Sequence, residues 1–115
     1  MIKAEFGIID EIDITKDYSE YNPDKYCCIA IDDDEYINDW WNELSIIKTY
    51  FHNLNRPSTA LARYGVTLIP PESLSAFLNI VLTDKRIYKD KNLIDLADKI
   101  EQAINENKFM IHYGV

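Results

Sequence analysis

The sequence predicts an α+β fold in a single domain that spans residues 1–115. Four short segments have the apolar runs or alternation of strands, and three segments repeat apolar residues at helical spacing. Hydrophobic side chains make up 47% of the chain and charged ones 28%, a balance that supports one buried core. The order β-β-α-β-α-α-β then favours a mixed four-stranded sheet with about three helices largely on one face. The alternative is a two-layer fold in which the first hairpin stands apart.

The first two strands are predicted at residues 3–13 and 26–31. The first segment alternates imperfectly, and the second, YCCIAI, is an uncharged run typical of a strand covered on both faces. Asn22-Pro23-Asp24 between them is a turn signal, so we expect a hairpin with a wide loop. Neighbours on a strand point to opposite faces, so Cys27 and Cys28 are expected to be reduced strand residues rather than a disulfide or a zinc site.

A long helix from Ile37 to Leu54 is the clearest predicted element. Its apolar residues recur at three- and four-residue steps and would form one continuous stripe. Ile46 lies outside this stripe, which is a sign of a contact beyond the domain. Asp32 to Glu35 precede the helix but lack the Gly and the closing Glu of a calcium loop. We therefore expect these acids to cap the helix and to interact with its dipole rather than to bind a metal.

The second half of the chain is predicted to hold a strand at 61–69, two helices and a final strand at 108–113. Pro70-Pro71 can open the first helix because proline is tolerated in a first turn. A polar link at 83–92 precedes the second helix, whose apolar positions run from 93 to 104. His112 is expected to be a half-buried sheet residue. If the second and third strands are parallel, the long helix between them forms a right-handed crossover.

Charge is distributed unevenly along the chain. Residues 1–44 hold 13 acids and 3 bases, whereas residues 45–115 hold 7 acids and 9 bases, and the net charge is −8. Phosphate binding requires clustered Lys and Arg, so nucleic acid is not an expected partner. The imbalance serves solubility, and it also suits a basic protein partner. The partner-binding residues expected on this basis are Asp32, Asp33, Asp34, Glu35, Asp39, Trp41, Glu43, Ile46 and Tyr50.

The chain has no segment that approaches the roughly 20 apolar residues of a membrane span. Its N-terminus also lacks the long apolar region of a signal peptide. We therefore expect a cytoplasmic protein that does not enter a membrane, and homo-oligomerisation stays open.

No catalytic, cofactor-binding or metal-binding motif is present in the sequence. The three glycines, Gly7, Gly65 and Gly114, are too few for a Gly-rich phosphate loop, and there is no G-x-S-x-G. We expect no catalytic residue, cofactor or metal. The alternative is a small enzyme or ligand-binding domain with an anion pocket, although the same side chains can form salt links to the acidic N-terminal half. The residues of this pocket would be His52, Arg56, Arg63 and Tyr64.

The centre of the chain holds Arg56-Pro57, Tyr64-Gly65-Val66-Thr67 and Ile69-Pro70-Pro71-Glu72-Ser73, and its last segment holds Ile111-His112-Tyr113-Gly114. With these residues the chain resembles the immunity proteins of bacterial polymorphic toxin systems. Immunity families differ widely in fold, so the resemblance assigns no binding residue. It implies a non-enzymatic protein that binds a cognate toxin domain, expected to be basic because this chain is acidic, and blocks its active site.

Overall fold

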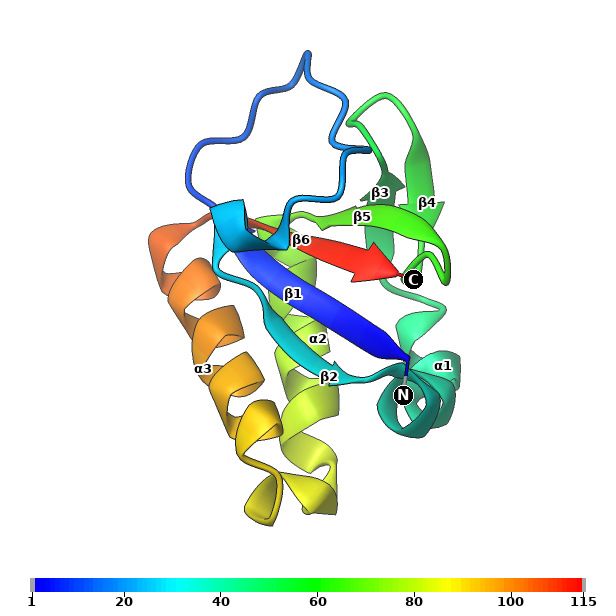
Figure 1. Cartoon of the computed structure of the whole chain (residues 1–115), viewed down its shortest axis with the longest axis vertical. Helices are drawn as coiled ribbons and strands as arrows, with labels where there is room; N and C mark the ends of the chain where they lie inside the picture. Colours follow the sequence, from blue (N-terminus) through cyan, green and yellow to red (C-terminus); the bar gives the residue numbers. More distant parts are fainter. Residues whose placement is uncertain (1, 115) are drawn as a thin grey trace.

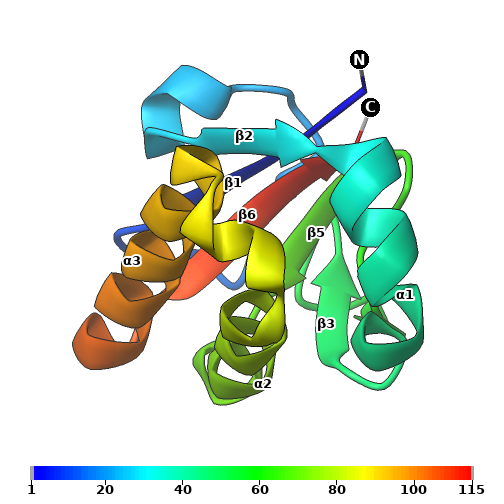
Figure 2. The ribbon, with the colours of Figure 1, turned by 90° about the horizontal axis from the view of Figure 1, so that it is seen from below.

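A computed structural model describes residues 2–114 and shows an antiparallel sheet with helices on one of its faces (Figures 1 and 2). The six strands follow the spatial order β2-β1-β6-β5-β3-β4. Their bounds are β1 (Lys3–Ile9), β2 (Ile29–Asp32), β3 (Lys48–Phe51), β4 (Pro57–Thr59), β5 (Gly65–Ile69) and β6 (Phe109–Gly114).

The helical elements are the π-helical turn η2 (Asp33–Ile37), α1 (Asn38–Leu44), α2 (Pro71–Thr83) and α3 (Lys91–Glu106), with short 3₁₀ turns η1 (Pro23–Tyr26) and η3 (Lys85–Tyr88). Their ends follow local chemistry. Pro71 occupies the first position of α2, and the Asp90 carboxylate caps α3 by accepting from the Asn92 N–H at 2.9 Å. Asn107 ends α3 in the left-handed conformation. The α+β class, the presence of three helices and the final strand were predicted correctly.

The main core lies between the sheet and the three helices. Residues of β1 and β6 alternate between the two faces of the sheet, as the strand period requires. Phe6 of β1 faces the helices and packs against Phe77 of α2, with ring centroids 5.3 Å apart. His112 of β6 packs against Phe6 on the same face. This histidine is only 1% exposed, so it is fully buried rather than half-buried as the sequence predicted.

The opposite face of the sheet is covered by the irregular segment between β1 and β2, residues 10–28. Tyr18 of this segment is buried, and its N–H donates to the His52 carbonyl at 2.7 Å. The Tyr18 hydroxyl accepts from the Asp13 N–H at 2.9 Å. A second cluster therefore lies here, composed of Ile9, Tyr18, Val66, Leu68, Ile111 and Tyr113.

The predicted helix from Ile37 to Leu54 is wrong beyond Leu44. Helix α1 ends there, a turn follows, and the chain continues as strand β3. Ile47, Thr49 and Phe51 alternate with Lys48 and Tyr50, which is a strand pattern rich in β-branched and aromatic residues. The same residues also fit the helical stripe. Burial against the sheet favours the strand over the helix.

The predicted four-stranded mixed sheet is also wrong, because the sheet within residues 2–114 has six strands and every pair is antiparallel. Strands β3 and β4 are the additional pair. They form a hairpin in which Pro57 begins a strand at the sheet edge, where a proline needs no ladder hydrogen bond. The strand predicted third corresponds to β5, which runs antiparallel to β2, so the right-handed parallel crossover does not form between these two strands. Instead, β6 lies between the first hairpin and the remaining three strands.

The second strand is shorter than predicted and lies at an edge of the sheet. Strand β2 begins at Ile29, whereas Tyr26 belongs to the turn η1. Cys27 is exposed in the left-handed conformation with φ 52°, so it is not a strand residue. The predicted hairpin with a wide loop is confirmed, since β1 pairs with β2 across residues 10–28.

Candidate functional site

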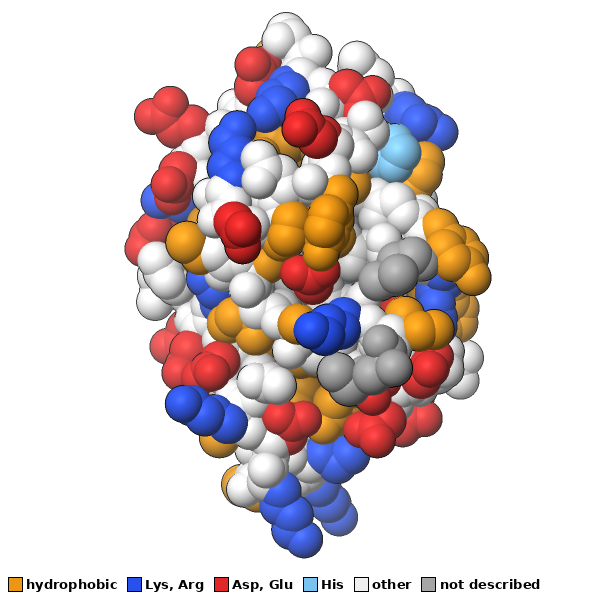
Figure 3. All heavy atoms as spheres, in the orientation of Figure 1, with side chains coloured by type: hydrophobic (Ala, Val, Ile, Leu, Met, Phe, Trp, Pro, Cys, Tyr) orange, Lys and Arg blue, Asp and Glu red, His pale blue; other side chains and the backbone are white. Residues whose placement is uncertain are grey.

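The acids of residues 1–44 do not form one surface. One group lies on the segment that covers the sheet, at Asp10, Glu11, Asp13, Asp17 and Glu20, where Lys16 and Lys25 are also exposed. Figure 3 shows acidic and basic side chains interspersed on this side of the molecule. The other group follows β2 and continues along α1. The charge asymmetry of the sequence therefore corresponds to two separate surfaces.

Helix α1 and the preceding turn η2 present an acidic surface to solvent. Ile37, Trp40 and Leu44 form the buried side of this segment. The opposite side carries four exposed acids, which we name the acidic helix face: Asp34, Glu35, Asp39 and Glu43. The first two also lie near the start of the helical segment, where the helix dipole favours negative charge.

Asp32 and Asp33 have structural partners instead. The Asp32 carboxylate caps η2 by accepting from the Glu35 N–H at 3.3 Å, as predicted. Asp33 is 4% exposed and forms an ion pair with Arg63 at 2.8 Å. Burial raises the pKa of Asp33, and the neighbouring Arg63 opposes this shift. Removing one member of such a pair leaves a buried charge without a partner, so Asp33 and Arg63 act as a unit.

Exposed apolar side chains lie beside the acidic helix face. The Arg63 guanidinium stacks over the Trp41 ring at 5.3 Å, and the next residue, Tyr64, is 79% exposed. Ile46 is 81% exposed in the turn after α1. The Ala60 N–H donates to the Ile47 carbonyl at 2.9 Å, which places this turn beside the segment that leads to Arg63. We name Trp41, Ile46 and Tyr64 the apolar patch.

An arginine fixes α1 to the link between α2 and α3. Arg86 binds the Asp84 carboxylate at 2.6 Å and Asp39 at 3.1 Å, and it stacks over the Tyr36 ring at 4.4 Å. The Trp40 indole N–H also donates to Asp84 at 2.9 Å. The hydrogen bond from Arg86 lowers the pKa of Asp84 to about 2. This network gives the acidic helix face a fixed position.

The four residues of the alternative anion pocket contact different groups. Arg56 stacks over Phe51 at 4.6 Å, and Phe51 in turn stacks on His52 at 3.8 Å. Arg63 binds Asp33 instead, which is one of the salt links to the N-terminal half that the sequence left open. His52 was expected at a helix end, but it follows β3 with φ 67°. Tyr64 is solvent-exposed.

Tyr50 lies away from the other predicted partner-binding residues. It belongs to β3, is half-buried, and packs with Phe109 in the cluster on the loop-covered face of the sheet. Its predicted place on the long helix was wrong, because β3 replaces that part of the helix.

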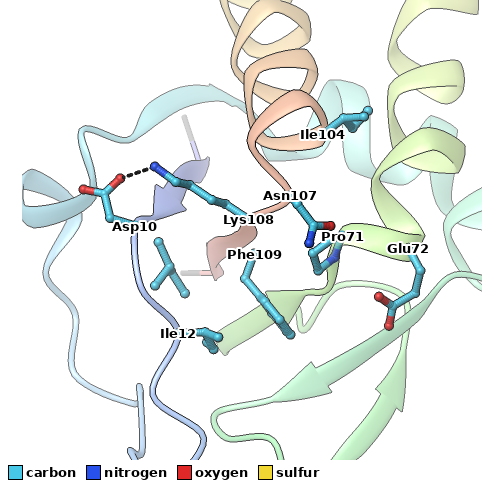
Figure 4. Close-up of a pocket in the computed structure, with 9 residues that line it drawn as sticks. Asp10, Ile12, Pro71, Glu72, Ile104, Asn107, Lys108 and Phe109 are labelled. Atoms are coloured by element: carbon cyan, nitrogen blue, oxygen red, sulfur yellow. Dashed lines mark hydrogen bonds and ion pairs between the residues drawn. The ribbon is translucent and has the colours of Figure 1, made fainter.

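Two surface hollows flank the start of α2. The first, of about 570 Å³, has the Asp10–Lys108 ion pair at one end and Glu72 at the other (Figure 4). The second, of about 590 Å³, lies between α2 and the β3–β4 hairpin. The first is lined by Ile9, Asp10, Ile12, Pro71, Glu72, Ile104, Asn107, Lys108 and Phe109. Its lining holds no side chain paired as nucleophile and base.

Among residues 2–114, no group of three or more His, Cys, Asp or Glu side chains is arranged to hold a metal ion. Within the same residues, no helix is long and apolar enough to cross a membrane.

Comparisons with protein-family models, with curated proteins and with solved structures give no match. Sequence reasoning left open a salt link from Arg63 to the N-terminal half without identifying Asp33 as its partner, and it missed the two hollows. Arg63 is isolated among apolar and polar neighbours, which was a signal for a specific acidic partner, but the sequence does not indicate which acid it binds. The hollows combine segments that are distant along the chain and left no local pattern.

Proposed function

We propose that this protein is a non-enzymatic binding protein that recognises a basic partner protein through the acidic helix face and the adjoining apolar patch. The observation that carries the proposal is the position of Ile46 and Tyr64. Both are largely exposed: Tyr64 follows Arg63, which stacks over the half-buried Trp41, and Ile46 lies in the turn beside the segment that leads to Arg63. Large apolar side chains and Arg next to a charged rim are the composition of protein-binding surfaces.

The two parts of this surface have different roles in binding. The acids of the acidic helix face attract a basic partner and raise its association rate, and salt weakens this attraction. Side chains of the apolar patch lose water on contact and therefore determine how slowly the complex dissociates. Asp33 is buried beneath this surface, where it holds Arg63 in position.

Within this class, we propose an immunity protein of a polymorphic toxin system, because the central and final residues of the chain resemble those of immunity proteins. The partner would then be a basic toxin domain in the cytoplasm, and binding would block its active site. The gene immediately upstream is the first source in which to seek such a domain.

The test uses the toxin domain encoded by that neighbouring gene. Association and dissociation are measured by surface plasmon resonance at several salt concentrations. The double variant Glu35→Lys/Glu43→Lys should associate at least tenfold more slowly at low salt. The matched control is Asp98→Lys/Glu101→Lys, which makes the same charge change on the exposed side of α3 and should have a much smaller effect. Tyr64→Ala should mainly accelerate dissociation.

Association that is indifferent both to salt and to the reversals at Glu35 and Glu43 would overturn the proposed surface. Absence of binding would show that this toxin domain is not the partner. Turnover of a small anionic substrate by the pure protein, lost in Arg56→Ala, would support the alternative anion pocket instead.

A further inference from the structure

Strand β4 leaves part of its backbone unpaired at the edge of the sheet. The Ala60 N–H donates to the Ile47 carbonyl and the Phe51 N–H to the Arg56 carbonyl, each at 2.9 Å, and Thr49 pairs with Ser58 between them. Hydrogen-bonded and non-hydrogen-bonded pairs alternate in an antiparallel ladder. Pro57 and Thr59 therefore turn their backbone groups away from β3, and of these groups the Thr59 carbonyl accepts a hydrogen bond from the Ser58 hydroxyl at 3.3 Å. All three residues of β4 are exposed, and no described strand lies beyond them.

The free edge borders the second hollow, which Pro57, Ser58 and Thr59 of β4 line. The two hollows share Glu72, and Pro70 and Pro71 line one hollow each. Tyr50 of the second hollow packs against Phe109 of the first, with ring centroids 6.5 Å apart. We name the two neighbouring hollows the α2 groove. Its apolar side chains are Ile9, Ile12, Tyr50, Pro57, Pro70, Pro71, Ile104 and Phe109.

One acid in the groove lacks an ionic partner. Asp10 and Lys108 pair at 3.1 Å, and Lys108 also binds Glu106 at 2.8 Å. Glu72 is exposed between the two hollows, and no ion pair among residues 2–114 includes it. The dipole of α2 by itself favours an acid in the first helical turn. The additional features are the apolar hollows on both sides of this acid and the unpaired backbone nearby.

We propose that the second hollow, Glu72 and the free edge of β4 bind an extended peptide segment of a partner protein, in which a Lys or Arg lies two residues from an apolar side chain. The Thr59 N–H and the Pro57 carbonyl form hydrogen bonds to the segment, as when a strand is added to a sheet. The basic side chain pairs with Glu72, and the apolar side chain two residues away, on the same face of the strand, enters the second hollow, which Pro57 and Thr59 line together with Glu72. This surface is distinct from the acidic helix face, and the inference does not depend on a toxin partner.

The extended conformation follows from the free edge, because a helical segment has no unpaired backbone groups to offer to β4. The short edge and the missing N–H of Pro57 limit the number of hydrogen bonds. Affinity for an isolated peptide is therefore expected in the micromolar range, on the order of 10–300 µM.

The probes are four synthetic peptides, acetyl-Ser-X-Thr-Lys-Thr-X-Ser-amide, where X is Val, Ile, Leu or Phe. Binding is measured by titration of the ¹⁵N-labelled protein in NMR. At least one peptide should shift the amide signals of Lys48, Thr59 and Glu72. Glu72→Lys should weaken its binding at least tenfold, whereas Glu101→Lys, an exposed charge reversal on α3, should leave it unchanged. A peptide with Glu in place of Lys should not bind.

Backbone pairing is tested on the peptide, so that the result does not depend on a protein variant that folds. Only alternate amides of an added strand face β4. N-methylation of one alternate set of amides should abolish binding, and N-methylation of the other set should not. Equal effects of the two sets, or equal binding by Glu72→Lys, would overturn the proposal. So would the absence of shifts with all four peptides at millimolar concentration. Concentration-dependent shifts at Thr59 without peptide would assign this edge to a second copy of the chain instead.

Discussion

The two faces of the sheet are covered in different ways. Three helices cover one face, and their ends are defined by caps such as Asp90 and Asn107. The irregular segment 10–28 covers the other, anchored by Tyr18 through hydrogen bonds to Asp13 and His52. Regular elements bury a stripe of side chains against the sheet, whereas a loop can bury only a few side chains at separate points.

This difference separates global stability from local stability. Loss of a side chain beneath the helices weakens the core that all elements share. Loss of a contact beneath the segment 10–28 permits that segment to open while the rest stays folded. Variants of single residues on each face distinguish the two responses.

The largest expected effect is on the helix-covered face. Phe77 of α2 is 1% exposed and packs against Phe6 of β1, so Phe77→Ala leaves a cavity between helix and sheet. We predict a loss of about 3–5 kcal/mol in the free energy of unfolding, measured by denaturant titration. Amides of β1 and α3 should lose exchange protection together. A loss below about 1 kcal/mol would show that the helices do not carry the core.

The second effect is the pH dependence of the same face. Burial lowers the pKa of His112 to about 3, and the positive charge of Arg63 adds to this shift. Between that value and the unfolded value of about 6.5, the unfolded chain binds a proton that the folded chain does not. Stability due to neutral His112 is complete above pH 6.5. Below it, we predict a loss of about 1.4 kcal/mol per pH unit.

The control for this pH dependence is His112→Leu, which cannot bind the proton. The difference in unfolding free energy between the variant and the parent chain should change with that slope from pH 6.5 to 4.5. A constant difference across this window would mean that His112 binds a proton in the folded protein as readily as in the unfolded chain.

A smaller effect is expected on the loop-covered face. Tyr18→Phe keeps the ring in the second cluster but removes the hydroxyl that accepts from the Asp13 N–H. We predict a loss of about 0.5–1.5 kcal/mol, confined to opening of the segment 10–28. Hydrogen exchange should accelerate at Asp13 and its neighbours while the amides of α2 keep their protection. Equal acceleration in α2 would show that the two faces unfold together.

The smallest effect is expected at Ile46, which packs on neither face. It is 81% exposed, so Ile46→Ala should change the free energy of unfolding by less than about 0.5 kcal/mol. The same variant should weaken binding if the apolar patch is the partner surface. A clear loss of stability in a denaturant titration would instead assign Ile46 to the core.

The elements that were predicted correctly are those whose residue pattern fits only one type of secondary structure. Helix α3 has a regular apolar stripe between two caps, and Pro70-Pro71 marks the start of α2. Residues 45–54 permitted both a helix and a strand, because Ile47 and Phe51 satisfy either period. Only burial against β5 distinguishes the two. The segment 10–28 has no period at all, so its role as the cover of a sheet face was not predictable.

The candidate site shows the same limit. The exposure of Glu43 follows from the side of α1 on which its spacing places it, and the exposure of Ile46 from its position outside the apolar stripe. The pairing of Asp33 with Arg63 joins positions 30 residues apart, and the α2 groove joins residues near 10, 72 and 108. Such combinations depend on the strand order, which local patterns do not specify.

Strand β6 is the last of the six along the chain, yet it lies near the middle of the sheet. It alone joins the first hairpin, β1 and β2, to the group of β5, β3 and β4. During synthesis, both parts therefore remain with an unpaired edge until the ribosome has released residues 109–114. Contacts between the ends of a chain form slowly because a long loop must close first. A chain stalled shortly before Phe109 would expose two incomplete sheets, and such intermediates are prone to aggregate.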